Sequence, residues 1–457
     1  MSADTATSRL PGPSLLGHAR YLKGLAGKPY DALLDLHRTY GPVCQFGFGN
    51  TRYVMMFGAE ANKLLLSDSP KKPKFLLRDV LGLLIPVVGS CAMVVSDGED
   101  HRRRRSLVQP AFAYRRLHNY VPTMLDEIHR MIDSWEVGAT VNAFADVRSC
   151  IRRIAIRSLF GERLKQHTDE IGHDLQIALN YINRSPFLRF DHDLPGTAYR
   201  RAMAARGRVV TLVDEEIARR KAKPDDQGDV LDVLVGSCTP SGEKLSDIEV
   251  RDQVISLIAS GYDSSSSAAG WAIYALLTHP EVYGTVRAEV TRVAGEEVLT
   301  QQHLEAMDYV GYTIKEILRL YTPGVLTGRT AVEDFEFAGY TVPKGTKVLY
   351  SQYVTHRMPE LWPQPLAFRP ERWDPSAPDY QEQVPYSWVP FGGGHRHCIG
   401  FTFAELELRA LIAELARRTE LATVGDPVQP TGVATMWPKG GVPVSVREIR
   451  PMVARTV

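Results

Sequence analysis

The chain has 457 residues, of which 44% are hydrophobic and 23% are charged, a composition typical of a globular protein with a large core. It contains 54 Lys and Arg residues against 53 Asp and Glu residues, so its formal net charge is +1. This balance provides no overall field that would attract nucleic acid or an anionic membrane, and the composition excludes wholesale disorder.

The five cysteines are widely spaced and include no C-x-x-C pair. An odd number at such spacing argues against a disulfide framework and suits a reducing compartment. The N-terminal residues show no secretory signal, and no apolar run reaches the ~20 residues that a spanning helix needs. We therefore expect a cytoplasmic protein without a membrane anchor.

The first elements along the chain are a turn and a hairpin. Pro11-Gly12-Pro13 predicts a stiff turn that ends a flexible arm over residues 1–10. Residues 43–48 and 52–57 are apolar runs on either side of Gly49-Asn50, and this pattern predicts a β-hairpin.

A basic run and a helical region follow. Residues 98–105 contain four consecutive arginines, Arg102 to Arg105, which on their own indicate a solvated basic patch. Between residues 114 and 236, apolar positions three and four apart predict a mostly helical region.

The longest predicted helix runs from the capping box Ser246-Asp247-Ile248-Glu249 to His279, where Pro280 ends it. Apolar residues cover nearly every side, so we expect a buried central helix. Its middle, residues 260–267, is rich in serine and contains Asp263. Serine hydroxyls compete for backbone carbonyls and predict a local bend, and a buried Asp263 needs a partner or a shifted pKa.

Glu316 and Arg319 lie three residues apart on a predicted helix, opposite its apolar stripe. On their own they indicate a solvated pair that contributes only about 0.2–0.5 kcal/mol. After this helix, residues 335–350 predict a second β region, because apolar residues flank the turn Pro343-Lys344-Gly345.

The most informative segment is the loop from Phe391 to Gly400, which precedes an apolar helical run over residues 401–415. Cys398 lies where this loop enters the helix, and the positive end of a helix stabilises a thiolate. The glycines Gly392 to Gly394 allow backbone to approach a flat ligand closely. Three alternatives stay open for the loop alone: a zinc site of His395, His397 and Cys398, a nucleophilic cysteine–histidine pair, and a glycine loop with a buried cysteine.

At this loop the chain resembles the cytochrome P-450 family of haem-thiolate monooxygenases. Phe391, Gly394, Cys398 and Gly400 match the cysteine loop of that family. Phe368-Arg369-Pro370-Glu371-Arg372-Trp373 is similar to a second motif of the family. Ser260-Gly261-Tyr262-Asp263-Ser264-Ser265 resembles its oxygen-activating helix, with Ser264 in place of the usual threonine.

The resemblance implies a mainly α fold with small β-sheets, the cytochrome P-450 fold, with haem b between the long central helix and the Cys-loop helix. It implies a single domain over residues 11–457, made of a helix-rich lobe and a smaller β-rich lobe, after the arm of residues 1–10.

The resemblance also implies roles for individual residues. Cys398 is the haem iron ligand, Phe391 and Gly392 lie at the haem, and His101, Arg105, Arg329 and Arg396 face its propionates. Asp263 and Ser264 are the catalytic pair that passes protons to dioxygen, and Glu316, Arg319 and Arg372 form a buried structural triad.

The implied activity is insertion of one oxygen atom from O2 into an apolar small molecule, by hydroxylation or epoxidation. No flavin or iron–sulfur motif follows the haem segment, so electrons are expected from NAD(P)H through a separate ferredoxin and ferredoxin reductase. The resemblance places the substrate pocket at residues 81–95, 259–264, 324–327 and 434–436.

Two other functions remain open. One is a haem-thiolate isomerase, dehydratase or peroxygenase that needs no electron donor, and the Asp263-Ser264 pair argues against it. The other is a non-enzymatic haem-binding protein.

Overall fold

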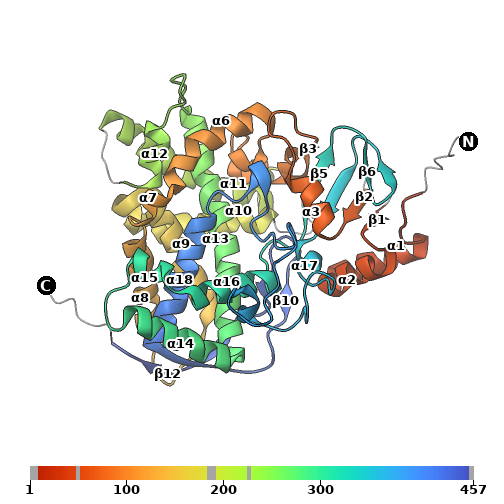
Figure 1. The fold of residues 1–457 in the computed structure, drawn as a ribbon. Coiled ribbons are helices and arrows are strands. Elements are labelled where there is room, and N and C mark those ends of the chain that lie inside the picture. Colours follow the sequence, from red (N-terminus) through yellow and green to blue (C-terminus); the bar gives the residue numbers. More distant parts are fainter. Residues whose placement is uncertain (1–8, 48–51, 183–191, 224–227, 452–457) are drawn as a thin grey trace, which may run out of the picture. The chain divides into compact units, whose positions relative to one another are not determined.

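The computed structural model describes residues 9–47, 52–182, 192–223 and 228–451 (Figure 1). The chain folds into two compact units, each assembled from segments that are far apart in the sequence. The first unit is drawn from residues 1–80, 315–398 and 430–437, and the second from residues 81–314, 399–429 and 438–457. A single domain over residues 11–457 stays a prediction.

The first unit contains a five-stranded sheet in the order β1-β2-β8-β5-β3. β1 (Val43–Phe46) and β2 (Tyr53–Met56) pair antiparallel, which confirms the predicted hairpin, and its Gly49-Asn50 turn lies outside the described residues. β8 (Lys347–Tyr350) runs parallel to β2 and antiparallel to β5 (Thr327–Ala331), and β5 pairs with β3 (Phe75–Leu76).

The other elements of the first unit are α1 (Leu15–Gly27), α2 (Pro29–Tyr40), α3 (Ala59–Leu66), β6 (Phe335–Phe337), β7 (Tyr340–Val342), α17 (Gln352–Thr355), η7 (Pro370–Trp373) and η8 (Gly394–Arg396). β6 and β7 pair antiparallel, and with β8 they confirm the predicted β region over residues 335–350. α4 (Arg78–Leu81) and α16 (Asp308–Leu320) each have residues in both units.

The second unit is mainly helical, which confirms the prediction for residues 114–236. Its helices are α5 (Ile85–Val88), α6 (Gly98–Val108), α7 (Tyr114–Leu117), α8 (Val121–Asp133), α9 (Ala143–Phe160), α10 (Thr168–Ile182), α11 (Ala198–Ala222), α12 (Val230–Gly236), α13 (Asp247–Thr278), α14 (Pro280–Ala294), α15 (Gln301–Glu305) and α18 (Phe401–Arg418).

Two small β elements complete the fold. A sheet in the second unit has the order β4-β12-β9, formed by β4 (Thr140–Asn142), β12 (Pro443–Ile449) and β9 (Thr419–Thr423). β10 (Pro430–Thr431) pairs with β11 (Trp437–Pro438).

The long helix α13 begins and ends where the sequence predicts. The Ser246 hydroxyl accepts the N–H of Glu249, and the Glu249 carboxylate accepts the N–H of Ser246 at 3.0 Å, which completes the capping box. His279 follows the last helical residue and precedes Pro280. The helix is buried along most of its length, with Tyr262 and Trp271 among its fully buried side chains. The bend expected in its middle stays a prediction.

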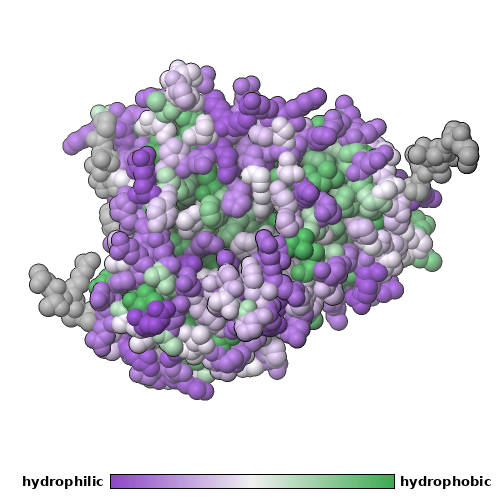
Figure 2. All heavy atoms as spheres, viewed as in Figure 1, coloured by the Kyte–Doolittle hydropathy of each residue, from purple (hydrophilic) through white to green (hydrophobic). Residues whose placement is uncertain are grey.

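Polar residues predominate on the face shown in Figure 2, and apolar residues reach the surface over α1, where Leu15 and Leu16 are exposed. Of the arm predicted over residues 1–10, only Arg9 and Leu10 are described, and Leu10 packs against the apolar core of the first unit's sheet. Among the described residues, no helix combines the length and the apolar character needed to cross a membrane.

Candidate functional site

Cys398 closes a tight loop in the first unit. Its N–H donates to the carbonyl oxygen of Phe391 at 2.9 Å, and the N–H of His397 donates to the carbonyl of Gly394 at 3.1 Å. The Cys398 side chain is exposed, and α18 begins three residues later, at Phe401. The predicted entry of the loop into a helix is therefore confirmed, and the thiol is accessible to a ligand.

Packing explains two of the three loop glycines. A Cβ on Gly394 would lie 1.9 Å from the carbonyl oxygen of Leu66, and Gly394 also has a φ of +59°. A Cβ on Gly393 would lie 3.2 Å from the Leu66 Cβ. Gly392 has a φ of +69°, and a Cβ there would make only an ordinary contact, 3.9 Å from the carbonyl oxygen of Arg396. Close approach to α3 thus requires Gly394, whereas Gly392 leaves room beside the loop.

A group of cationic side chains lies around the loop. Arg329 on β5 is buried, its guanidinium lies 5.6 Å from the Tyr350 ring centroid, and it donates to the carbonyl of Gly328 at 2.8 Å. Within the described part of the chain, no carboxylate pairs with Arg329. Burial lowers the pKa of His395, and the charges of Arg396 and Arg329 also lower it, although the hydrogen bond to Asp68 opposes them.

This environment suits the haem that the resemblance implies. A buried guanidinium without a carboxylate has a desolvation cost that an anionic partner would offset. The planar fork of arginine binds carboxylates such as propionates in bidentate fashion. The exposed thiol and the buried Arg329 therefore provide a soft metal ligand and an anion site in the same unit.

The zinc alternative finds no support. Across the residues that the structure describes, no group of three or more His, Cys, Asp and Glu side chains is placed to hold a metal ion. His395 instead has its Nδ1 3.0 Å from the backbone oxygen of Asp68.

Asp263 and Ser264 lie at the middle of α13, in the second unit. The Asp263 carboxylate is 3.5 Å from the guanidinium of Arg148 on α9, which also donates to the Tyr262 hydroxyl at 3.2 Å. Asp263 thus has the partner that its position requires. The Ser264 hydroxyl is exposed and donates to the backbone carbonyl of Ser260 at 3.0 Å, so the predicted competition for carbonyls occurs here.

His101 and Arg105 lie four residues apart on α6, with His101 buried and Arg105 half-buried. The interpretation of this run as a solvated patch is wrong for Arg104. Arg104 is buried and donates to Glu249 on α13 at 3.0 Å, and Arg103 binds the same carboxylate. Burial raises the pKa of Glu249, but its hydrogen bonds and the two arginines outweigh burial, and the net pKa is lowered.

Glu316, Arg319 and Arg372 meet in the first unit. Arg319 donates to both carboxylate oxygens of Glu316, at 2.8 and 2.9 Å, and the Arg372 Nε donates at 3.0 Å. Both Glu316 and Arg319 have fully buried side chains, so they are not the solvated pair that their spacing alone indicates. Burial raises the pKa of Glu316, but the two arginines outweigh it and hold the pKa below its usual value.

His356 links this triad to the start of the cysteine loop. Its backbone carbonyl accepts from Arg319 at 2.8 Å, and its Nδ1 is 3.2 Å from the carbonyl of Arg319. Its Nε2 accepts the N–H of Val389 at 3.0 Å, two residues before Phe391. Complete burial lowers the pKa of His356, so the ring is neutral and its Nδ1 carries the proton. Sequence spacing gives no signal for this contact.

Glu407 is a buried acid that the sequence does not reveal. It lies on α18, is 1% exposed, and one of its carboxylate oxygens has no hydrogen-bond partner. Burial raises its pKa to about 8, although a hydrogen bond from Ser265 on α13 opposes this shift. A neutral carboxylic acid therefore lies next to the serine-rich part of α13.

The segments expected to form the substrate pocket associate in pairs. In the first unit, Gly324 bridges to Thr435, and the Met436 N–H donates to the carbonyl of Pro323 at 3.0 Å. In the second unit, apolar side chains of residues 81–95 pack against Ala259 of α13. The structure thus brings the four segments together two by two, one pair in each unit. A single substrate pocket formed by all four stays a prediction.

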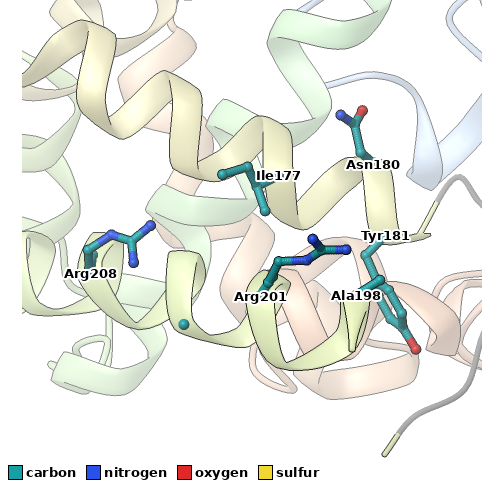
Figure 3. A pocket seen from close by; sticks show the side chains of 7 residues that line it. Ile177, Asn180, Tyr181, Ala198, Arg201 and Arg208 are labelled. Atoms are coloured by element: carbon teal, nitrogen blue, oxygen red, sulfur yellow. The ribbon is translucent and has the colours of Figure 1, made fainter. Parts of the chain in front are cut away.

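A cavity of about 460 Å³ lies elsewhere in the second unit, between α10 and α11 (Figure 3). Arg201 extends from α11 toward α10, and Arg208 binds Asp174 at 2.8 Å. None of the predicted site residues lines it; its lining residues are Ile177, Asn180, Tyr181, Ala198, Arg201, Ala204 and Arg208.

Comparison with known proteins gives a consistent result. A model of the family described as "Cytochrome P450" matches residues 10–440. A protein described as cytochrome P450 139 from Mycobacterium tuberculosis is 39% identical over 425 residues, which are 92% of this chain and 98% of that protein. Cyclooctat-9-en-7-ol 5-monooxygenase from Streptomyces melanosporofaciens is 34% identical over 73% of each chain.

A solved structure shows the same fold. The retinoic acid-bound cyanobacterial CYP120A1 superposes with a TM-score of 0.87 at 25% identity, over 97% of this chain and 100% of the other. The mainly helical architecture with small sheets is therefore that of this cytochrome P450 structure.

Proposed function

The chain belongs to the cytochrome P450 family and is a P450 monooxygenase, and we propose that it inserts one oxygen atom from O2 into an apolar small molecule, by hydroxylation or epoxidation. The observation that carries this proposal is the exposed Cys398 in a loop whose neighbouring Arg329 is buried without a carboxylate partner among the described residues. A haem propionate would supply the missing negative charge, and the thiolate would supply the iron ligand.

The cofactor assigned to this site is haem b. When bound, it supplies the activation of dioxygen, which a thiolate ligand promotes by pushing electron density toward the iron. Cys398 is assigned as the ligand, with Phe391 and Gly392 next to the haem. The propionate-binding groups are assigned as His101, Arg105, Arg329 and Arg396.

The chain's own contribution to proton transfer is assigned to α13. Asp263 holds its carboxylate against Arg148, and Ser264 presents a hydroxyl one residue further along. A carboxylate next to a hydroxyl can hold water and move a proton inward, which is general acid chemistry. Glu316, Arg319 and Arg372 are assigned a structural role, because they fix the surroundings of the cysteine loop without facing substrate.

The substrate class is proposed to be apolar: a lipid, a terpenoid or a steroid. Apolar residues at Val88, Ala92 and Val95 around Ala259 support this class. Two comparisons support the same class. One relative is named for cyclooctat-9-en-7-ol, and the related solved structure has retinoic acid bound. Electrons are proposed to come from NAD(P)H through a ferredoxin and a ferredoxin reductase, in the cytoplasm, where the five free cysteines would persist.

The test is the absorption spectrum of the reduced, carbon monoxide-bound protein, followed by turnover assays. We expect a thiolate-ligated haem spectrum in the wild type and its loss in Cys398→Ala. A protein that stays colourless when hemin is supplied, or a Cys398→Ala spectrum identical to the parent's, would disprove the assignment. Turnover that needs no NAD(P)H would instead favour the peroxygenase or isomerase class.

A further inference from the structure

Residues 82–95, called the 82–95 segment below, consist of very short elements: η2 (Gly82–Leu84), α5 and η3 (Met93–Val95). A single helical turn is not stable by itself in water, because its nucleation costs more than one hydrogen bond returns. The conformation of this segment therefore depends on what its backbone contacts elsewhere in the second unit.

Two consecutive residues of α13 bind the backbone of this segment. The Asp252 Oδ2 accepts the N–H of Cys91 at 3.0 Å. The Gln253 side-chain amide accepts the N–H of Met93 at 2.8 Å and donates to the carbonyl of Cys91 at 2.6 Å. Asp252 and Gln253 are both buried, at 2% and 1% exposure, so water does not compete for these bonds.

Gly89 permits the close approach of the segment to α13. A Cβ at this position would lie 2.1–2.2 Å from the Asp252 carboxylate, and Gly89 has a φ of +88°. Any other residue would therefore displace either the segment or Asp252.

Arg206 connects the same carboxylate to α11. Its Nε donates to the carbonyl of Val87 at 2.8 Å, and its guanidinium lies 3.9 Å from Asp252 Oδ1. This Oδ1 is buried without a hydrogen bond, and Arg251 is 3.6 Å away. One carboxylate thus joins α11, α13 and the 82–95 segment, and its charge is balanced by two arginines.

The segment also carries apolar side chains toward the middle of α13. Val88, Ala92 and Val95 pack with Ala259, which precedes Asp263 by one helical turn. A shift of the segment would therefore move apolar groups that lie close to the proposed proton-transfer pair.

We propose that Asp252, Gln253 and Arg206 are positioning residues that hold the 82–95 segment in one conformation and thereby set which apolar substrates the enzyme accepts. This inference rests on the proposed function, since it assigns the segment to the substrate site. The hydrogen bonds to the backbone fix the segment, and Arg206 makes its position depend on α11.

The experiment compares Gly89→Ala with Gly242→Ala in the haem-loaded protein. Gly242 has a similar φ of +85° but no atom within 4 Å of an added Cβ, so it reproduces the backbone strain without the clash. Arg206→Met is a milder second variant that removes the link to α11. The probes are imidazole and a series of n-alkylimidazoles, which bind haem iron and extend an apolar chain of increasing length.

Hydrogen exchange of residues 89–95 should be faster by roughly tenfold or more in Gly89→Ala, because the clash separates the amides of Cys91 and Met93 from their buried acceptors. It should also be faster in Arg206→Met, because the Val87 carbonyl loses its donor and Asp252 loses a balancing charge, which loosens the segment. The affinities for long alkylimidazoles should change by roughly tenfold in the same variants, while the affinity for imidazole stays constant. Gly242→Ala should match the parent in both measurements.

The proposal is overturned if exchange in both test variants equals that in Gly242→Ala, or if exchange rises while every alkylimidazole affinity stays within about twofold of the parent's. Failure of the proposed function has a different signature. In that case imidazole itself would not shift the absorption spectrum of the parent, whereas the exchange measurement would still report on the segment.

Discussion

Glu316 is the buried carboxylate that binds both arginines of the triad in the first unit. Besides the two arginines of the triad, the Trp373 Nε1 and the Arg369 N–H donate to its carboxylate, each at 3.0 Å. These N–H groups share one buried anion as their acceptor, so removing its charge weakens all of these bonds at once, although Arg319 keeps its bond to the carbonyl of His356.

We expect Glu316→Gln to lower the free energy of unfolding by about 3–5 kcal/mol, because it leaves buried guanidinium charge without compensation. Denaturant titration of the haem-loaded protein measures this change. Glu371→Gln, at an exposed position of the same motif, should change stability by no more than about 0.5 kcal/mol. Equal stabilities for the two variants would contradict the structural role of Glu316.

Ser264 offers a prediction about the coupling of electron use to product. Serine lacks the methyl group that restricts the rotamer of threonine, so its hydroxyl is held less firmly. We expect Ser264→Thr to release less hydrogen peroxide per NAD(P)H consumed than the wild type does. The control is Ser241→Thr, in an exposed turn, which should release as much peroxide as the wild type. Equal peroxide release from Ser264→Thr and the wild type would refute the role of the Ser264 rotamer in coupling.

Among the helices and strands, local sequence patterns predicted the β1–β2 hairpin, the limits of α13 and the start of α18. The hairpin of β1 and β2 follows from two apolar runs around a turn, and α13 follows from a capping box at Ser246 and a proline after His279. The entry of the cysteine loop into α18 was predictable for the same reason, since glycines and the onset of an apolar period are adjacent in the sequence.

Contacts between elements were not predictable from such signals. Arg104 belongs to an arginine run that is typical of a solvated surface, yet Glu249 from α13 binds it. The burial of Glu407 depends on how α18 packs in the second unit, and no neighbour in the sequence indicates it. Only the family resemblance placed Glu316, Arg319 and Arg372 together, because their spacing alone is equally compatible with an exposed pair.

The capping box gives a prediction for α13. Ser246→Ala removes the hydroxyl that satisfies the N–H of Glu249, and we expect a loss of about 0.5–2 kcal/mol in the free energy of unfolding. Thermal and denaturant unfolding measure it. Ser241→Ala, which caps no helix, should leave the thermal and the denaturant unfolding midpoints unchanged. A Ser246→Ala protein as stable as the wild type would show that the cap contributes nothing to stability.

For the whole molecule, Glu407 makes stability depend on pH. Burial raises its pKa from the ordinary value of 4.5 to about 8, so over this range the folded state retains a proton that the unfolded chain releases. The stability that comes from the neutral carboxyl is therefore fully present below pH 4.5 and is lost as the pH rises to about 8.

The slope contributed by this one group reaches up to about 1.4 kcal/mol per pH unit. We expect Glu407→Gln, which is neutral at every pH, to remove this slope between pH 5 and 8, whereas Glu215→Gln at an exposed position of α11 keeps it. Unfolding midpoints in denaturant across this range test the point. Parallel pH profiles for wild type and Glu407→Gln would show that Glu407 does not titrate in this way.

The interleaving of the two units also has a consequence for biosynthesis. Residues 430–437 belong to the first unit, and the Tyr30 hydroxyl donates to the carbonyl of Gly432 at 2.6 Å across 402 positions of sequence. The N-terminal part of the chain therefore leaves the ribosome long before its last partner has been translated. Such distant pairing slows folding and prolongs the exposure of apolar strands. We therefore expect chaperones to assist this chain during its synthesis.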